Sequence, residues 1–198
     1  LEAAGENVRL KVVETLAPRP SPPIRIVLCQ AVLKNPAMDL VVEKASELGA
    51  AALRPFLASR SVVKPDGKST ANKIRRWNEI AAGAAKQSDR GAPINIEQIL
   101  TFAGMLATLR RGKNNLNLIL WEKEEEETFP AVIDRYRTIK EATVIVGPEG
   151  GFSDGEIDSA GKAGALPVGL GSRILKAETA AIVITALLQY EYRGFETS

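Results

Sequence analysis

The sequence predicts an α/β fold, in which a mostly parallel sheet has helices on both faces and a short β element precedes it. Three observations support this prediction. From residue 24 onward, short apolar runs alternate with segments of helical period; a proline-rich stretch precedes them; and glycine-rich loops follow two of the runs. Such alternation is typical of βα crossovers, which make neighbouring strands parallel. At 198 residues the chain can bury a substantial core.

The first residues predict a separate β element. Val8, Leu10 and Val12 recur at every second position, which indicates a half-buried strand over residues 8–13. Prolines at positions 18, 20, 22 and 23 cannot continue a helix or a sheet ladder, so they predict a stiff linker. We therefore place a domain boundary after residue 23, with the main domain over residues 24–198.

The main domain is predicted to contain five strands with helices between them. The apolar runs that predict strands are residues 24–29, 52–56, 116–121, 143–146 and 166–170. Residues 71–90 have one apolar face and a basic side, as in a helix that packs on a core. The last helix, residues 177–192, is apolar around most of its circumference. Packing on the sheet and packing in a subunit interface both fit that pattern.

Composition excludes several classes of chemistry. The sequence has no histidine and one cysteine, so Ser-His-Asp and Cys-His activation and nearly every zinc site are excluded for these residues. Cys29 lies in an apolar run and is predicted to be a buried small hydrophobe. No apolar run reaches the length of a membrane span and no signal peptide is recognisable, so we expect a cytoplasmic protein. The run Glu124 to Glu127 is interpreted as a solvated acidic turn or helix start.

The strongest local signal is the glycine-rich loop after the run at 143–146. Ser153 and Glu156 have the spacing of a capping box, which predicts that a helix starts directly after the loop. In open α/β sheets, ligands bind where a strand's carboxyl end meets a helix start. The glycines at 147, 150 and 151 permit close approach of a ligand to the backbone.

The chemistry of this loop disfavours a polyphosphate. It lacks the Lys-Ser/Thr ending of a P-loop, and Glu149 places a negative charge where a phosphate needs positive ones. A nucleoside that carries a cation fits better, and S-adenosylmethionine, with its sulfonium and ammonium groups, is such a ligand. Taken alone, the loop is equally compatible with a structural turn.

A second glycine-flanked strand exit follows at residues 166–180. Gly169 and Gly171 free the backbone, while Leu170, Ile174 and Leu175 are apolar where a surface loop is normally polar. Such side chains favour a flat apolar ligand surface, such as an adenine ring. Two such loops in succession favour a ligand site over a purely structural role.

These segments resemble a known family. The pieces Gly147-Pro148-Glu149-Gly150-Gly151-Phe152 and Leu170 to Ala180 resemble the two signature loops of the ribosomal RNA small subunit methyltransferase E family, in the SPOUT methyltransferase superfamily. The resemblance covers residues 24–189. Further blocks in the right order are Lys34, residues 44–49, residues 60–63, Arg76-Trp77 and residues 87–90.

The resemblance implies a fold and an activity. It implies a parallel α/β SPOUT domain over residues 24–198, with a C-terminal trefoil knot whose loops hold S-adenosylmethionine. It also implies a homodimer that packs near the knot and methylates N3 of a uridine in 16S ribosomal RNA, alone or in the small ribosomal subunit. Residues 1–23 would be the end of a PUA-like β domain plus linker. No metal or membrane partner is implied.

The sequence departs from the family pattern in two ways. Most of the PUA-like domain and the family's histidines are missing from it, which bears on RNA affinity. Lys176 stands where arginine is more usual, so the charge is kept while bidentate hydrogen bonding is lost.

Site residues follow from the loops and the resemblance. For catalysis, we expect Arg173 or Lys176 to supply positive charge to the uracil oxygens, and Glu149 or Glu178 to orient the base or accept its proton. A helix-start role facing the dipole is the alternative for Glu178. The expected cofactor-binding residues are Leu120, Gly147, Pro148, Glu149, Gly150, Gly151, Leu170, Gly171, Ile174 and Leu175.

RNA contact needs a local basic patch, because the net charge is only +2. Trp77 lies on the apolar face of its helix and is predicted to be core. Scattered surface charges are the alternative to a patch. The predicted RNA-binding residues are Arg60, Lys64, Lys73, Arg76 and Arg90.

Three other functions compete with this one. They are a SPOUT methyltransferase for another RNA site, a non-catalytic RNA-binding or ribosome-assembly protein, and an unrelated nucleotide-binding α/β enzyme. The acidic residue in the first glycine-rich loop argues against the last.

Overall fold

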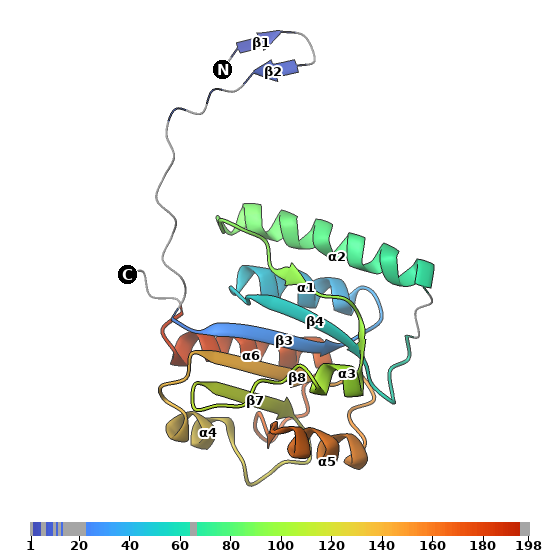
Figure 1. The fold of residues 1–198 in the computed structure, drawn as a ribbon, viewed down its shortest axis with the longest axis vertical. Helices are drawn as coiled ribbons and strands as arrows, with labels where there is room; N and C mark the ends of the chain where they lie inside the picture. The colour runs from blue at the N-terminus through green and yellow to red at the C-terminus, as the bar shows by residue number, and fades with distance from the viewer. Residues whose placement is uncertain are drawn as a thin grey trace.

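The main domain is built on a seven-stranded sheet in which every pairing is parallel (Figure 1). The computed structural model describes residues 2–4, 7–9, 11, 13, 23–63 and 67–194. The strand order is β5-β4-β3-β8-β7-β9, with β6 also paired to β4. The strands are β3 (Arg25–Ala31), β4 (Ala52–Leu57), β5 (Asn95–Ile96), β6 (Leu100–Thr101), β7 (Asn115–Leu120), β8 (Glu141–Val146) and β9 (Leu166–Val168).

The sequence predicted β3, β4, β7, β8 and β9 but not the two-residue strands β5 and β6, which carry too few residues to show a period. Helices cover both faces of the sheet, as predicted. They are α1 (Ala37–Glu47), α2 (Gly67–Gln87), α3 (Phe102–Leu106), α4 (Phe129–Arg135), α5 (Asp154–Ala163) and α6 (Ala177–Glu191).

The N-terminal residues form a separate two-stranded antiparallel sheet, β1 (Glu2–Ala4) with β2 (Asn7–Arg9). The strand predicted over residues 8–13 is therefore shorter, because Lys11 and Val13 lie outside it. Leu10, Val12 and the linker residues 14–22 lie outside the described residues, and the domain boundary after residue 23 stays a prediction.

The central strand β3 divides two apolar clusters. Ile26 and Leu28 face the cluster that includes side chains of α1, α2, α4 and α6, whereas Val27 and Cys29 face the cluster that includes those of α3 and α5. Burial on both faces explains why the strand reads as a continuous apolar run rather than an alternating one. Cys29 is fully buried, and this burial raises the pKa of its thiol to about 12, which confirms the prediction of a small buried hydrophobe.

Helix α6 packs against α1, β3 and β8, so the sheet accounts for its buried face. Ala181, Ile184 and Leu188 are buried there. Ile182 and Val183 are half-buried. The reading of this helix as packed on the sheet is confirmed. No helix in the described part of the chain is long and apolar enough to span a membrane.

A capping box starts α5, as the sequence predicts. The Ser153 hydroxyl accepts a hydrogen bond from the Glu156 backbone N–H, and the Glu156 carboxylate accepts one from the Ser153 backbone N–H at 2.9 Å. The same carboxylate also accepts hydrogen bonds from the backbone and hydroxyl of Ser59, each at 2.8 Å. Burial raises the pKa of Glu156, but these hydrogen bonds outweigh it and the net pKa is lowered.

Replacing Glu156 with Gln should therefore destabilise the fold in a pH-dependent way. Because the folded-state pKa lies below the ordinary value, the ionised carboxylate stabilises the fold above that value, and the effect is lost as the pH falls through the lowered pKa. We expect a loss of about 1–3 kcal/mol at neutral pH. Urea unfolding at neutral and acid pH measures it. Asp158→Asn, an exposed change in the same helix, is the control; a deficit independent of pH would contradict the expectation.

Candidate functional site

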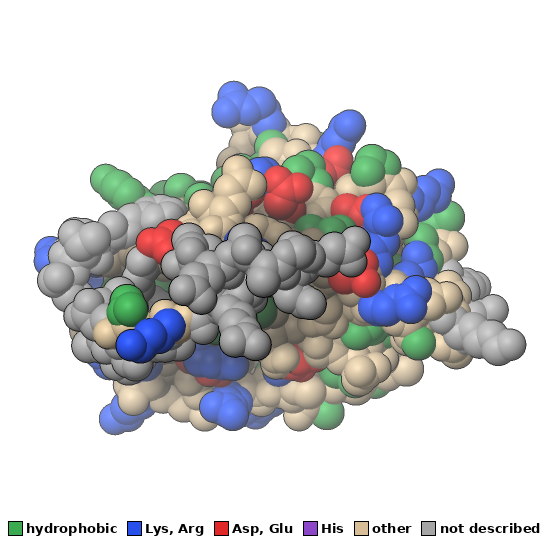
Figure 2. Space-filling model, turned by 90° about the horizontal axis from the view of Figure 1, so that it is seen from above, with side chains coloured by type: hydrophobic (Ala, Val, Ile, Leu, Met, Phe, Trp, Pro, Cys, Tyr) green, Lys and Arg blue, Asp and Glu red, His purple; other side chains and the backbone are tan. Residues whose placement is uncertain are grey.

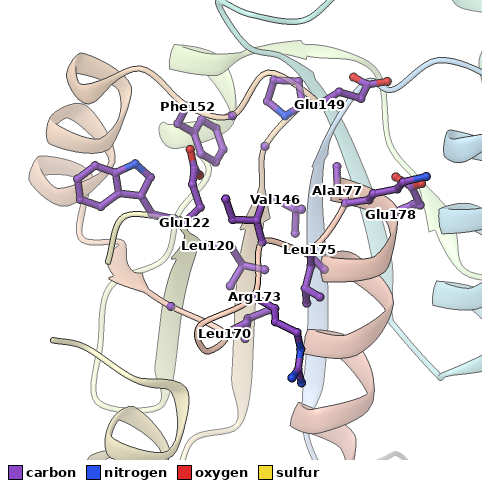
Figure 3. A pocket seen from close by; sticks show the side chains of 18 of the residues that line it. Leu120, Glu122, Val146, Glu149, Phe152, Leu170, Arg173, Leu175, Ala177 and Glu178 are labelled. Carbon is purple, nitrogen blue, oxygen red and sulfur yellow. The ribbon is translucent and has the colours of Figure 1, made fainter. Parts of the chain in front are cut away.

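A cavity of about 1100 Å³ lies at the carboxyl ends of the strands (Figure 3). Four chain segments line it, namely those that follow β3, β7, β8 and β9. The two glycine-rich loops predicted from the sequence thus face one cavity. Its lining includes the predicted cofactor residues Leu120, Gly147, Pro148, Glu149, Gly150, Gly151, Leu170, Gly171, Ile174 and Leu175, together with Arg173, Lys176 and Glu178.

The loop after β9 passes so close to the segment after β7 that Gly169 has no room for a side chain. A Cβ there would lie 2.3 Å from the Glu124 carbonyl oxygen. The Gly169 N–H donates to the Glu127 carbonyl at 3.0 Å, and Thr128 and Gly169 form a parallel bridge. Gly171 has a φ of +102°, which favours glycine. The second loop is therefore held in place by backbone contact with residues 124–128.

The first loop is anchored by its aromatic residue. Phe152 is buried and stacks against Phe56 with ring centroids 6.4 Å apart, and Phe102 packs beside both rings. A Cβ on Gly147 would lie 3.0 Å from the Phe152 ring. The buried Gln30 side chain donates to the Gly147 carbonyl at 3.2 Å. These contacts fix both ends of the turn that faces the cavity.

The centre of the cavity is apolar. The side chains of Leu120, Val146, Leu170 and Leu175 lie together there, Leu120 and Val146 from the ends of β7 and β8 and both Leu170 and Leu175 from the loop after β9 (Figure 3). Ile174 also lines the cavity, and the residue is 84% exposed. A pocket with an apolar floor and backbone polar groups at its rim is typical of a small-molecule or cofactor site.

Carboxylates surround this apolar centre. Glu122, Glu124, Glu125, Glu149 and Glu178 line the cavity, against the cations Lys34, Arg173 and Lys176. An acidic rim of this kind disfavours a phosphate and favours a cationic ligand. Among the described residues, no group of three His, Cys, Asp or Glu could hold a metal ion.

Two of these carboxylates have structural partners. The Glu149 carboxylate accepts a hydrogen bond from the Lys34 backbone N–H at 3.1 Å, so it joins the loops after β8 and β3. One oxygen of Glu124 accepts the backbone N–H groups of Glu126 and Glu127, both at 3.0 Å. The acidic run thus precedes α4 as interpreted, but it is not merely solvated, because Glu124 is half-buried and lines the cavity.

Sequence reasoning missed that Glu122, Glu124 and Glu125 line the cavity. A signal existed: the run directly follows a strand end, as both glycine-rich loops do.

None of the predicted RNA-binding residues that the structure describes lines the cavity. Arg60 donates to carbonyls of the first loop, and Arg76 makes a salt bridge with Asp39 at 2.7 Å. Arg90 donates to the Ser46 and Ala50 carbonyls, at 2.6 Å and 3.2 Å, and burial lowers its pKa. Lys73 is half-buried on α2, and Lys64 lies outside the described residues. Trp77 is fully buried, which confirms its core role.

This fold and cavity match a known class of protein. A family model described as an RNA methyltransferase domain matches residues 20–189, which is most of the chain. The chain is therefore of the RNA methyltransferase class.

Named relatives narrow the class further. Ribosomal RNA small subunit methyltransferase E of Mesomycoplasma hyopneumoniae is 32% identical over 186 residues, covering 89% of this chain and 74% of that protein. Its counterpart in Bacillus subtilis is 28% identical over 190 residues, covering 94% and 73%. The chain belongs to the ribosomal RNA small subunit methyltransferase E family.

Solved structures agree with this assignment. A methyltransferase from Legionella pneumophila, in complex with the bound cofactor SAM, is 34% identical with a TM-score of 0.80, covering 87% of this chain and 68% of that one. Ribosomal RNA small subunit methyltransferase E from Neisseria gonorrhoeae, bound to S-adenosyl methionine, is 29% identical with a TM-score of 0.77, covering 86% and 68%.

Gly169→Ala should destabilise the protein, because the added methyl group would overlap the Glu124 carbonyl and force the two loops apart. Overpacking of this kind costs about 1–3 kcal/mol. Chemical denaturation measures the change. Gly83→Ala in α2 is the matched control, since a Cβ there meets nothing within 4 Å and alanine favours the helix. Equal stability of the two variants would contradict the close approach.

Proposed function

We propose that this protein binds S-adenosylmethionine in the cavity and methylates N3 of a uridine in 16S ribosomal RNA of the small subunit. One observation carries the proposal: the two glycine-rich loops of a member of this family meet around one cavity that is apolar at its centre and acidic at its rim. The SAM named with the two structural neighbours supports the choice of cofactor.

The residues of the cavity fit such a cofactor. Leu120, Leu170 and Leu175 offer an apolar surface for a purine ring, and the backbone at the glycines offers hydrogen-bonding groups without steric hindrance. Glu122 and its acidic neighbours would offset the positive charge of a sulfonium and an ammonium group. When bound, the cofactor supplies an electrophilic methyl group.

The protein's part in the reaction is to place the uridine and to stabilise charge on its ring. The imide nitrogen of uridine is protonated at neutral pH, so the site needs a base or a way to stabilise the imide anion. Arg173 and Lys176 line the cavity and would stabilise negative charge on the uracil oxygens. Glu149, held by the Lys34 backbone, and Glu178, in the first turn of α6, are the carboxylates that would orient the base or accept its proton.

For RNA contact we propose the basic side of α2, with Lys73 and Arg76 from the predicted set and the exposed Arg75 added to it. Arg60, Lys64 and Arg90 are the other three residues that the sequence predicts to contact RNA. On the face shown in Figure 2, basic side chains are spread among acidic ones rather than gathered into one patch. On this face the dispersion favours the alternative of scattered surface charges, so the proposed RNA contact rests on the basic side of α2.

The chain crossing at the cavity supports a C-terminal trefoil knot. Strand β9 lies beyond β7 at the sheet edge, whereas α6 packs on β3 and β8. Residues 169–176 must therefore cross the ends of β7 and β8, and Gly169, the first of them, lies against residues 124–128. We propose that this crossing is the threading point of the knot.

Two further family features are proposed, each on a single observation. Half-buried apolar residues of α6, such as Ile182 and Val183, support a homodimer that packs there. The antiparallel pair β1 and β2 supports the assignment of residues 1–23 to the end of a PUA-like β domain.

The proposed activity predicts that calorimetric titration will detect S-adenosylmethionine binding and that labelled methyl will pass to small-subunit RNA as 3-methyluridine. Nucleoside analysis of the labelled RNA identifies the product. Label in another nucleoside would assign the protein to a different RNA site. Binding without transfer would indicate a non-catalytic RNA-binding protein, and absence of binding would remove the cofactor proposal.

Arg173→Ala should lower turnover far more than cofactor affinity, because its positive charge is needed for the transition state rather than for binding the cofactor. Loss of one such electrostatic contact lowers kcat roughly 100-fold. Single-turnover methyl transfer and calorimetry on the same preparation separate the two effects. Arg173→Lys keeps the charge and should retain part of the rate. An equal loss of turnover and cofactor affinity would sink the assignment.

A further inference from the structure

The loop between β4 and α2 holds the first glycine-rich loop from outside the cavity. One guanidinium nitrogen of Arg60, Nη1, donates to the Gly150 carbonyl at 3.1 Å and to the Phe152 carbonyl at 3.2 Å. Beside it, the backbone and hydroxyl of Ser59 donate to the Glu156 carboxylate. The Ser61 hydroxyl accepts the Ala58 N–H at 3.0 Å, which braces the β4–α2 loop itself. The two loops are thus joined by directed hydrogen bonds.

Glycine at position 150 permits this contact. A Cβ on Gly150 would lie 3.3 Å from the Arg60 Cβ, tighter than ordinary van der Waals contact. Gly151 adopts a φ of +67°, a conformation that other residues resist. Two neighbouring glycines have wide backbone freedom, so a turn built on them keeps one shape only if other groups fix its peptide planes.

Arg60 makes one of the two hydrogen bonds that fix each of two peptide planes in this turn. In the Gly150–Gly151 peptide, the N–H donates to the Pro148 carbonyl at 2.9 Å while the carbonyl accepts from Arg60. In the Phe152–Ser153 peptide, the N–H donates to Glu156 while the carbonyl accepts from Arg60. Each peptide is therefore hydrogen-bonded at both its N–H and its carbonyl, and Arg60 is the donor to both carbonyls.

We propose that Arg60 is a positioning residue that holds the Gly150–Phe152 turn in the shape needed for cofactor binding, rather than mainly an RNA contact. Its effect on the cofactor rests on the proposed function, since the turn lines the proposed S-adenosylmethionine cavity. Arg60 itself does not line the cavity, so it acts through the turn. The contact also joins that turn to the segment that leads into the basic helix α2.

The test compares Arg60→Ala, Arg60→Lys and wild type in the full chain. Without any cofactor, hydrogen exchange of the amides of residues 150–153 should be faster in Arg60→Ala, because the turn samples other conformations. Calorimetry should then show S-adenosylmethionine affinity weakened roughly 10- to 150-fold, the range for losing a hydrogen bond from a charged group. Arg60→Lys, which keeps a charged donor, should recover part of both effects.

Arg137→Ala is the matched control for loss of a surface guanidinium. Arg137 is exposed and pairs with Asp134 before β8 begins, near the amino ends of the strands, whereas the cavity lies at their carboxyl ends. The Arg137→Ala substitution should leave hydrogen exchange at residues 150–153 and cofactor affinity unchanged.

A role mainly in RNA binding gives a different pattern. The slope of log affinity for RNA against log salt concentration would fall by about one in Arg60→Ala, while cofactor affinity and exchange stay at wild-type values. That result would overturn the proposal. Unchanged exchange in Arg60→Ala would overturn it too, whatever the wild type binds. Faster exchange with no cofactor binding by wild type would remove the proposed cofactor and leave the positioning contact standing.

Discussion

The site depends on one close approach, that of Gly169 to the carbonyl of Glu124. Backbone packs on backbone there because glycine has no Cβ, and the contact is reinforced by the hydrogen bond from Gly169 to Glu127. It allows the chain to leave β9 at the sheet edge and return across the strand ends to α6. Without that crossing, the second glycine-rich loop would lie beside β7 and would not face the first.

The first loop is held at the same cavity by side-chain contacts rather than by a backbone contact. It is too rich in glycine to hold its own shape, so its order comes from neighbours on three sides: Phe152 in the aromatic cluster beneath it, Gln30 at its start and Arg60 outside it. These tertiary contacts thus remove the conformational freedom that the glycines give the loop. The resulting turn lines the cavity with its glycine backbone and with Glu149, while the Phe152 ring is buried in the aromatic cluster.

The sequence predicted much of this arrangement, and the reasons for its failures are physical. Strands such as β3 and β8 are buried on both faces, so their apolar runs were visible, and the capping box at Ser153 located the start of α5. The sequence did not show which groups the arginine side chains would contact. Arg60 and Arg90 read as surface charges, yet they donate to carbonyls that are distant in the sequence, and only the fold brings those groups together.

Acidic residues outnumber basic ones around the cavity, where five carboxylates face three cations. Carboxylates at Glu122, Glu124 and Glu125 surround the cavity, whereas the exposed cations Arg75 and Arg76 lie on α2, outside the cavity lining. The net charge of +2 is the sum over 26 basic and 24 acidic residues, so it says nothing of where each kind lies. A cationic small molecule and a polyanion require opposite potentials, and one surface cannot offer both at short range. The proposed function requires both, and Arg60 hydrogen-bonds the turn that lines the acidic cavity to the loop that precedes α2.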